Sequence, residues 1–218
     1  MKAGAVAIAV GVLVTGAGAW AWLGRPAPAI ANSAHAAAHV QLAPAAQAIP
    51  AAGRLFLTKD QLTQAMASGT LDHPVKSLLA TERPMYFGDY QWNDRGVPAG
   101  PTWIRIDLGS QLISVFRAGY EIGTAVIVYG GDNKQTPLGK LHVLAKAKDH
   151  RSSLYDAQMP YTLRLTNDGV SIHASDVRYG AATHGCIGVP LAFAKRLFEA
   201  ASVGDEVTVV PAAAHQTA

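Results

Sequence analysis

The sequence predicts a mostly β fold, a sandwich or barrel, with one helix after its single cysteine. From Trp103 onward, short stretches alternate between apolar and polar residues, as in strands with one buried face. Turn-forming residues separate these stretches roughly every eight to twelve residues, a spacing typical of all-β domains. Of the 218 residues, 50% are hydrophobic and 15% are charged, so the chain can form a substantial core.

Residues 1–24 are predicted to be a signal peptide or a membrane anchor. The uncharged run from Ala3 to Gly24 reaches roughly 33 Å as a helix, enough to cross a hydrocarbon core of about 30 Å. Trp20 and Trp22 stand near its end, where aromatic residues favour the membrane interface. Ala17-Gly18-Ala19 fits a signal peptidase site, whereas the length of the run favours an anchor. Both alternatives export the rest of the chain.

Residues 25–53 form an almost uncharged segment that is rich in alanine and proline and has no apolar periodicity. Such a composition predicts an extended linker rather than a packed element. A linker here provides reach from a membrane to a distant substrate.

Residues 54–83 are predicted to be a small helical segment. Thr58-Lys59-Asp60-Gln61 has the pattern of a capping box at a helix start, and Gly69 is a suitable stop. After a break at His73-Pro74, the stretch from Val75 to Ala80 is compatible with another helical turn.

A β-hairpin is predicted next. Apolar and polar residues alternate from Trp103 to Leu108, Gly109-Ser110 suits a two-residue turn, and Gln111 to Arg117 forms the returning strand. Further strands are expected at Thr124 to Tyr129 and at Leu141 to Lys146.

The last strands surround the cysteine. Residues alternate from Tyr161 to Leu165, and Asn167-Asp168-Gly169 is a turn into Val170-Ser171-Ile172. Pro190 then suits the start of a helix, which Gly204 ends, before a closing strand from Glu206 to Val210 and a loose tail, 211–218. The expected buried face of that helix comprises Leu191, Ala194, Leu197, Phe198 and Ala201.

The chemistry is expected around Cys186. His184 stands two residues before it and His173 ends the preceding strand. A thiol acts as a nucleophile in its thiolate form, and an imidazole is the usual activating group. Gly185 and Gly188 allow the backbone to turn sharply and to present N–H groups to a carbonyl. The pattern therefore predicts a Cys–His acyl-transfer enzyme.

Two other interpretations of Cys186 stay open. A lone cysteine is often a small buried hydrophobe, and a zinc hydrolase could use His173, His184 and Cys186. The paired spacings of structural zinc sites are absent from the sequence. One cysteine excludes an intramolecular disulfide, and an unpaired thiol in an exported protein is a candidate reactive group.

Several ordered motifs resemble the L,D-transpeptidase family, the YkuD-type catalytic domain. Ile172-His173-Ala174 followed by Thr183-His184-Gly185-Cys186-Ile187 looks like the family signature. Gln135-Thr136-Pro137-Leu138-Gly139 resembles its T-P-x-G turn, and Met159-Pro160-Tyr161 is similar to another family stretch. The resemblance covers residues 84–210 and implies a mostly β catalytic domain.

The resemblance implies a role for each residue near the cysteine. Cys186 is the nucleophile and His173 the base, with an imidazole that stabilises the thiolate and lowers the thiol pKa. The other ring nitrogen of His173 needs an acceptor, either Ser175 or a backbone carbonyl. Supporting or oxyanion-hole roles fall to the three residues His184, Gly185 and Thr183.

A substrate-binding role is expected for Tyr155, Met159 and Tyr161, although core packing is an equal alternative for each. Gly188 stands where the family usually has arginine. Either another cation supplies that contact, or the contact is absent and activity is weak; the first outcome is expected, because Cys186 and His173 are intact. Arg164 and Arg178 are the candidates, and Arg178 is preferred because it lies in the loop between His173 and Cys186.

The implied partners are peptidoglycan stem peptides in the periplasm or cell envelope, and an uncleaved anchor at residues 1–24 would attach the protein to the inner membrane. Cys186 attacks the bond before the terminal D-Ala, and an amine of a second stem, water or an outer-membrane protein amine accepts the acyl group. A low-activity peptidoglycan-binding module is the alternative. No metal or organic cofactor is implied, and a net charge of +3 without basic runs gives no indication of nucleic acid binding.

Overall fold

The computed structural model describes residues 53–131, 134–152 and 156–211. The predicted fold class is confirmed, because the described chain forms two β-sheets and two helices. The segment 1–24, nearly all of the linker 25–53 and most of the tail lie outside the described residues. Among the described residues, no helix is both long and apolar enough to cross a bilayer.

The larger sheet has the strand order β1-β2-β6-β5-β4-β12-β7, with β3 paired to β6. The strand nearest the C-terminus, β12, lies between β4, to which it is parallel, and β7, to which it is antiparallel. The strands are β1 (Arg54–Phe56), β2 (Ser77–Leu79), β3 (Tyr90–Trp92), β4 (Thr102–Asp107), β5 (Leu112–Arg117), β6 (Tyr120–Val126), β7 (Gly139–His142) and β12 (Glu206–Val210).

The smaller sheet has the order β11-β10-β9-β8, and its two strands nearest the cysteine, β10 and β11, are parallel. Its strands are β8 (Ala145–Ala147), β9 (Thr162–Arg164), β10 (Ser171–Ala174) and β11 (Ile187–Val189). The helices are α2 (Lys59–Ala67) and α3 (Leu191–Ala200).

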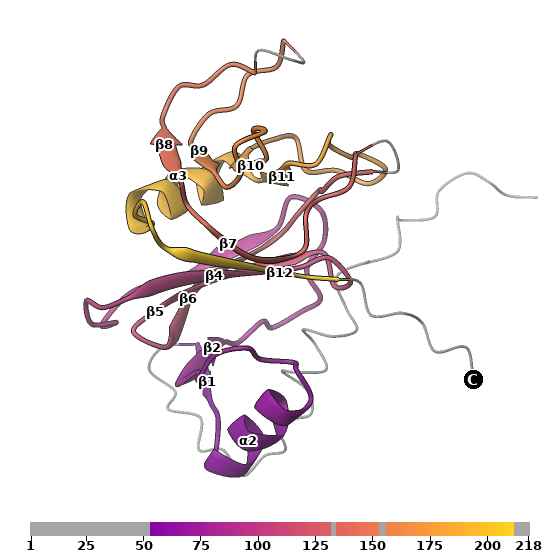
Figure 1. Cartoon of the computed structure of the whole chain (residues 1–218). Helices are drawn as coiled ribbons and strands as arrows, with labels where there is room; N and C mark the ends of the chain where they lie inside the picture. The colour runs from indigo at the N-terminus through magenta and orange to yellow at the C-terminus, as the bar shows by residue number, and fades with distance from the viewer. Residues whose placement is uncertain (1–52, 132–133, 153–155, 212–218) are drawn as a thin grey trace, which may run out of the picture.

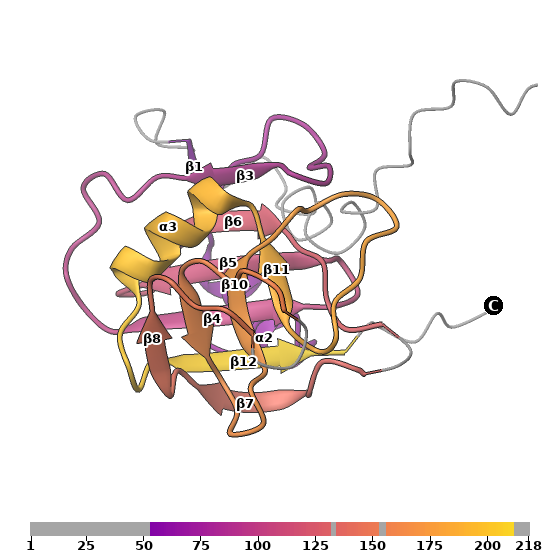
Figure 2. The ribbon, with the colours of Figure 1, turned by 90° about the horizontal axis from the view of Figure 1, so that it is seen from above.

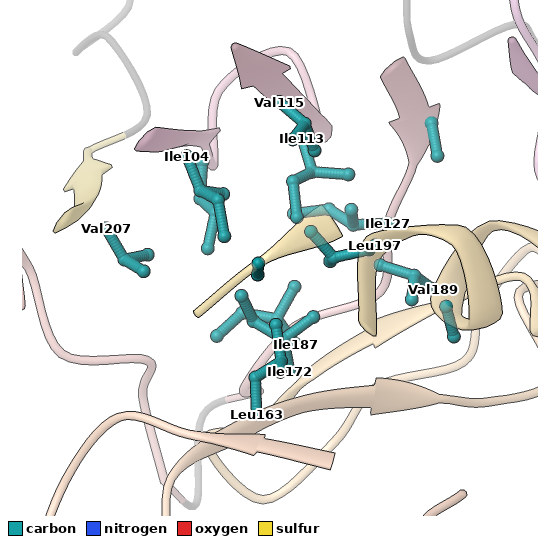
Figure 3. Close-up of a cluster of buried hydrophobic side chains, with 14 of the residues drawn as sticks. Ile104, Ile113, Val115, Ile127, Leu163, Ile172, Ile187, Val189, Leu197 and Val207 are labelled. Atoms are coloured by element: carbon teal, nitrogen blue, oxygen red, sulfur yellow. The ribbon is translucent and has the colours of Figure 1, made fainter. Parts of the chain in front are cut away.

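The smaller sheet and α3 cover one face of the larger sheet, and α2 lies on the other side (Figure 1, Figure 2). The main core fills the space between the two sheets, where apolar side chains from both point toward one another (Figure 3). The larger sheet contributes Ile104, Ile113, Val115 and Val207, and the covering layer contributes Leu163, Ile172, Ile187, Val189 and Leu197.

The segment before residue 84 contributes strands as well as a helix. The predicted capping box is confirmed, because the Gln61 N–H donates to the Thr58 hydroxyl at 3.2 Å and the Thr58 N–H donates to the Gln61 side chain at 2.9 Å. The helical turn expected between Val75 and Ala80 is wrong, since strand β2 lies there with every residue buried. Periodicity cannot separate a short buried strand from a helical turn.

Two buried charged residues, Arg54 and Glu121, tie this segment to the larger sheet. The Leu79 N–H donates to the Glu121 carboxylate at 2.7 Å, and the Arg54 guanidinium donates to the Glu121 backbone carbonyl at 2.5 Å. Burial lowers the pKa of Arg54, which Glu121 opposes. Strands β1 and β2 therefore extend the sheet beside β6 through polar contacts as well as backbone pairing.

The hairpin of β4 and β5 is confirmed, but its turn differs from the prediction. Asp107 pairs with Leu112, which leaves a four-residue loop instead of a two-residue turn at Gly109-Ser110. The Asp107 carboxylate accepts the N–H groups of Gly109 and Ser110 at 2.9 and 3.0 Å. Gln111, rather than a glycine, takes the left-handed conformation, with φ of 55°.

The single strand expected from Leu141 to Lys146 is two strands in different sheets, β7 and β8. The chain crosses between sheets at Val143, which is fully buried. A continuous alternating pattern does not show that a strand changes sheets, because both halves keep one face toward the same core.

The helix α3 buries a face slightly rotated from the predicted one. Ala194, Leu197 and Ala201 are buried as expected, but Leu191 is 59% exposed. Phe193 takes its place, with its ring edge-on to Trp92 at 5.5 Å between centroids. The larger aromatic side chain fills the space against the sheet, so the first helical residue is left at the surface.

Candidate active site

A cavity of about 620 Å³ lies over the smaller sheet and the loop before β11. Five of the predicted site residues line it: Cys186, His173, His184, Thr183 and Met159. Sequence separation hides this proximity, because the parallel pairing of β10 with β11 brings the histidine strand beside the strand that follows the cysteine. The structure therefore brings together the residues that the family resemblance groups.

His173 is held at the cavity wall by its strand. Ile172 turns into the core and His173 turns to the opposite face, with only 9% of its surface exposed. Its Nδ1 contacts the Ala174 backbone carbonyl oxygen at 2.8 Å. Since a carbonyl oxygen only accepts, Nδ1 carries the proton and Nε2 keeps its lone pair. A backbone carbonyl, one of the two expected acceptors, therefore sets the tautomer.

The electrostatics of His173 favour the neutral ring. Burial lowers the pKa of His173, the hydrogen bond to Ala174 opposes this effect, and the nearby His150 adds to it. A neutral imidazole with Nε2 unprotonated is the form required of a general base.

Cys186 is half-buried at the edge of the cavity, and its thiol lies 3.9 Å from the Gly169 carbonyl oxygen. Burial raises the pKa of the Cys186 thiol, while the Ser171 backbone N–H and the charge of Lys134 act in the opposite direction. The net shift is upward, so the expectation of a lowered thiol pKa is wrong for this structure. Burial thus favours the neutral form of the Cys186 thiol, as it does that of the His173 ring.

The loop before the cysteine is fixed by Thr183. Its N–H donates to the Tyr129 carbonyl at 2.9 Å, and its hydroxyl donates to the Cys186 carbonyl at 2.5 Å. Gly185 between them has φ of 96°, a conformation that favours glycine. The loop thus turns sharply just before the thiol, and Thr183 closes it locally.

Thr136 fixes the same loop from the other side, a role that the sequence did not reveal. Its buried hydroxyl donates to the Gly185 carbonyl at 3.0 Å and accepts the Gly130 N–H at 3.0 Å. The signal for it is the Thr-Pro-x-Gly turn, which marks a position but not its contact 49 residues away.

Gly188 lies where two other side chains leave no room. It pairs with His173 across β10 and β11, and with Val128 on its other side. A Cβ atom on Gly188 would lie 2.7 Å from the Ser175 Cβ and 2.7 Å from a Val128 methyl, closer than real Cβ contacts. Ser175 and Val128 thus occupy the space where an arginine side chain would begin.

The two candidate arginines have different locations. Arg178 is exposed, forms an ion pair with Asp176 at 3.1 Å, and is not among the described residues that line the cavity. Arg164, on β9, does line it. The structure therefore places Arg164, not the preferred Arg178, at the candidate site.

The residues expected to bind substrate also differ in where they lie. Met159 is buried and lines the cavity, whereas Tyr161 packs its ring on Phe198 at 5.7 Å between centroids and is not part of the described lining. Tyr155 lies outside the described residues. Tyr161 therefore has the packing role, whereas Met159 is placed where it can contact a ligand in the cavity.

No group of three or more His, Cys, Asp or Glu side chains in the described parts of the chain is arranged to hold a metal ion.

Comparison with known families gives one match that spans half of the chain. The sequence profile of the L,D-transpeptidase catalytic domain, YkuD, matches residues 101–209 of the 218. The matched range begins just before β4 and ends within β12, so it includes the whole smaller sheet and the larger sheet without β1, β2 and β3. No curated protein matches the chain significantly.

Several solved structures resemble the chain. An L,D-transpeptidase from Stackebrandtia nassauensis is 24% identical with a TM-score of 0.48, over 52% of this chain and 57% of its own. L,D-transpeptidase 1 of Mycobacterium tuberculosis is 25% identical with a TM-score of 0.44, over 50% of this chain and 60% of its own. The E. faecium L,D-transpeptidase catalytic domain is 28% identical with a TM-score of 0.45, over 50% of this chain and 96% of its own. The chain thus spans less than two thirds of the first two.

Proposed function

This chain belongs to the family of L,D-transpeptidase catalytic domains (YkuD), and from that membership we propose that it is a cysteine-dependent acyltransferase of peptidoglycan stem peptides. The observation that carries the proposal is the shared cavity of Cys186 and His173, in which the Ala174 carbonyl holds His173 in the tautomer of a base. Stem peptides lie in the cell envelope, so export by residues 1–24, as signal peptide or anchor, is part of the same proposal.

In the first step, the Cys186 sulfur attacks the carbonyl carbon between the third residue of a stem peptide and its terminal D-Ala. The thiol proton passes to Nε2 of His173 as the bond forms, a route that is consistent with burial favouring the neutral form of both groups. The backbone N–H groups of Gly185 and Cys186 are the candidate donors to the oxyanion, and the left-handed turn at Gly185 supports this assignment.

Collapse of the tetrahedral intermediate breaks the bond to the D-Ala nitrogen, which takes the proton from His173. D-Ala leaves, and the acyl group remains on Cys186 as a thioester. In the second step, the amine of another stem attacks the thioester, gives its proton to His173, and forms a 3→3 cross-link with release of the thiol. Met159 contributes to the cavity wall, and Thr183 and His184 border the reacting sulfur.

Incubation of the exported part of the chain with tetrapeptide muropeptides, followed by mass spectrometry, tests the proposal. Dimers that have lost one D-Ala are the expected product. Tripeptide monomers alone would show that water is the acceptor, and attachment to a protein amine would appear as a modified polypeptide. Unchanged substrate beside a folded protein would contradict the proposal and favour a binding module.

A further inference from the structure

The face of the smaller sheet turned away from the core, here called the outer face, carries Arg164. Side chains that pair across neighbouring strands share a face. Arg164 pairs with Ala145 on β8 and Ser171 on β10, and Ser171 shares its face with His173 two residues on. All of these residues line the cavity, as the alternation requires.

Arg164 is the one lysine or arginine on this outer face. The smaller sheet, which the structure describes completely, contains only one other such residue, Lys146. Lys146 pairs with Leu163, whose side chain is buried in the core on the opposite face. Its ammonium group lies over the Phe198 ring at 4.6 Å and donates to the Ala201 carbonyl.

The cations that line the cavity differ in their partners. Lys134 forms an ion pair with Asp168 at 3.3 Å, and Lys146 is bound as described above. The guanidinium of Arg164 is exposed and has no partner among the residues that the structure describes. With Lys134 paired to Asp168 and the Lys146 ammonium held at Phe198 and Ala201, Arg164 is the cation of the described lining that is available to an anionic ligand.

Gly188 and Arg164 lie on the two strands that flank β10. Gly188 on β11 pairs with His173, and Arg164 on β9 pairs with Ser171, two residues before His173. No side chain fits at Gly188, because Ser175 and Val128 fill that space. Among the strand residues of the smaller sheet, the fixed positive charge on the outer face is therefore that of Arg164, on the β9 side of β10.

We propose that Arg164 binds a carboxylate of the acyl-donor stem peptide and so determines donor specificity. The inference rests on the proposed function. A guanidinium presents a planar fork of N–H donors that matches a carboxylate, which a lysine does not reproduce. Two carboxylates of the donor share this chemistry: the terminal carboxylate of D-Ala and a side-chain carboxylate on the third residue.

Steady-state kinetics with three tetrapeptide donors test this proposal. One donor has both carboxylates free, one has a C-terminal amide, and one has its third-residue side chain amidated. We expect Arg164→Gln to lower kcat/KM on the free donor by about tenfold or more. Arg164→Lys should recover part of the loss. Arg196→Gln, an exposed arginine on α3 outside the cavity lining, is the matched control and should behave as wild type.

The amidated donors identify the carboxylate through double-mutant logic. Amidation of the bound carboxylate should lower wild-type kcat/KM by a similar factor and make the enzyme insensitive to Arg164→Gln. Amidation of the other carboxylate should leave the arginine effect intact. An equal loss on all three donors, or no loss on the free donor, would overturn the proposal.

Failure of the proposed function gives a different result from failure of the carboxylate contact. If wild type turns over none of the donors, the acyltransferase proposal is at fault. Calorimetric binding of the same three peptides to Cys186→Ala, with and without Arg164→Gln, then tests the carboxylate contact alone. Equal affinities of both proteins for the free peptide would overturn it there too.

Discussion

The hydroxyl of Thr136 donates to the carbonyl of Gly185 at 3.0 Å, directly before the cysteine in sequence. The same oxygen accepts the N–H of Gly130, so one buried side chain links the stretch after β6 to the cysteine loop. We expect Thr136→Val, which keeps the shape but leaves both backbone groups unpaired, to cost about 1–3 kcal/mol of stability. Urea unfolding of the variant and wild type measures this loss of stability. Thr136→Ser retains the hydroxyl and should lose far less; equal losses would assign the effect to packing of the methyl group.

Cys186→Ala should abolish turnover and thiol labelling while the fold persists. The thiol is small and only half-buried, so its removal opens little volume. Product analysis by mass spectrometry gives the activity, and circular dichroism with thermal melting gives the fold. Turnover by this variant would remove Cys186 from the role of nucleophile.

His173→Ala should lower turnover more than His184→Ala. His173 has its tautomer fixed by Ala174, and loss of a general base costs about 10²–10⁴-fold in rate. His184 is exposed at the cavity rim and is expected to act through the shape of the loop. Rates of D-Ala release from both variants make the comparison, with melting curves as the folding control. A larger effect at His184 would show that the base is misassigned.

Labelling of Cys186 by iodoacetamide should follow a thiolate pKa above that of free cysteine, which is about 8.5. Burial raises the pKa of this thiol, so the thiolate fraction at neutral pH falls below that of free cysteine and grows as pH rises through the raised value. The rate measured against pH, with Cys186→Ala as the unlabelled reference, gives the midpoint. A midpoint below that of free cysteine would indicate a preformed thiolate–imidazolium pair in the free enzyme.

Gly188→Ala should destabilise the fold by about 1–3 kcal/mol, since the new Cβ meets Ser175 and Val128 at 2.7 Å each. A second change, Ser175→Gly, removes one of the two contacts and should recover part of the loss. Chemical denaturation of the single and double variants gives the coupling. Full stability of the single variant would show that the neighbouring strands shift at little cost, so that an arginine could be accommodated.

Much of this fold follows from local pattern. The β4–β5 hairpin, the capping box at Thr58 and the helix after Pro190 each follow from a few neighbouring residues. Strand β2 and the split between β7 and β8 did not follow, because their conformation depends on which distant strand they meet. Pairing partners are long-range information that a period of two does not contain.

In the candidate site, too, local motifs were predicted and long-range placement was not. Cys186 and His173 were predicted from sequence motifs, and the cavity brings them together. Arg178 was preferred over Arg164 because it is closer to Cys186 in sequence, yet Arg178 turns to Asp176 at the surface. Arg164 reaches the cavity through sheet register, which places β9 beside β10. Distance along the chain was therefore a poor guide to distance in space.

The position of β12 has a consequence for how the molecule is made. It is the last of the described strands along the chain, yet it inserts between β4 and β7. Until residues 206–210 emerge, β4 has an open edge and β7 has no partner in the larger sheet. Completion of the sheet has to wait until every other described strand has been made, because long-range pairings of this kind form late. A nascent chain interrupted before Glu206 would expose two unpaired edges, which are templates for aggregation.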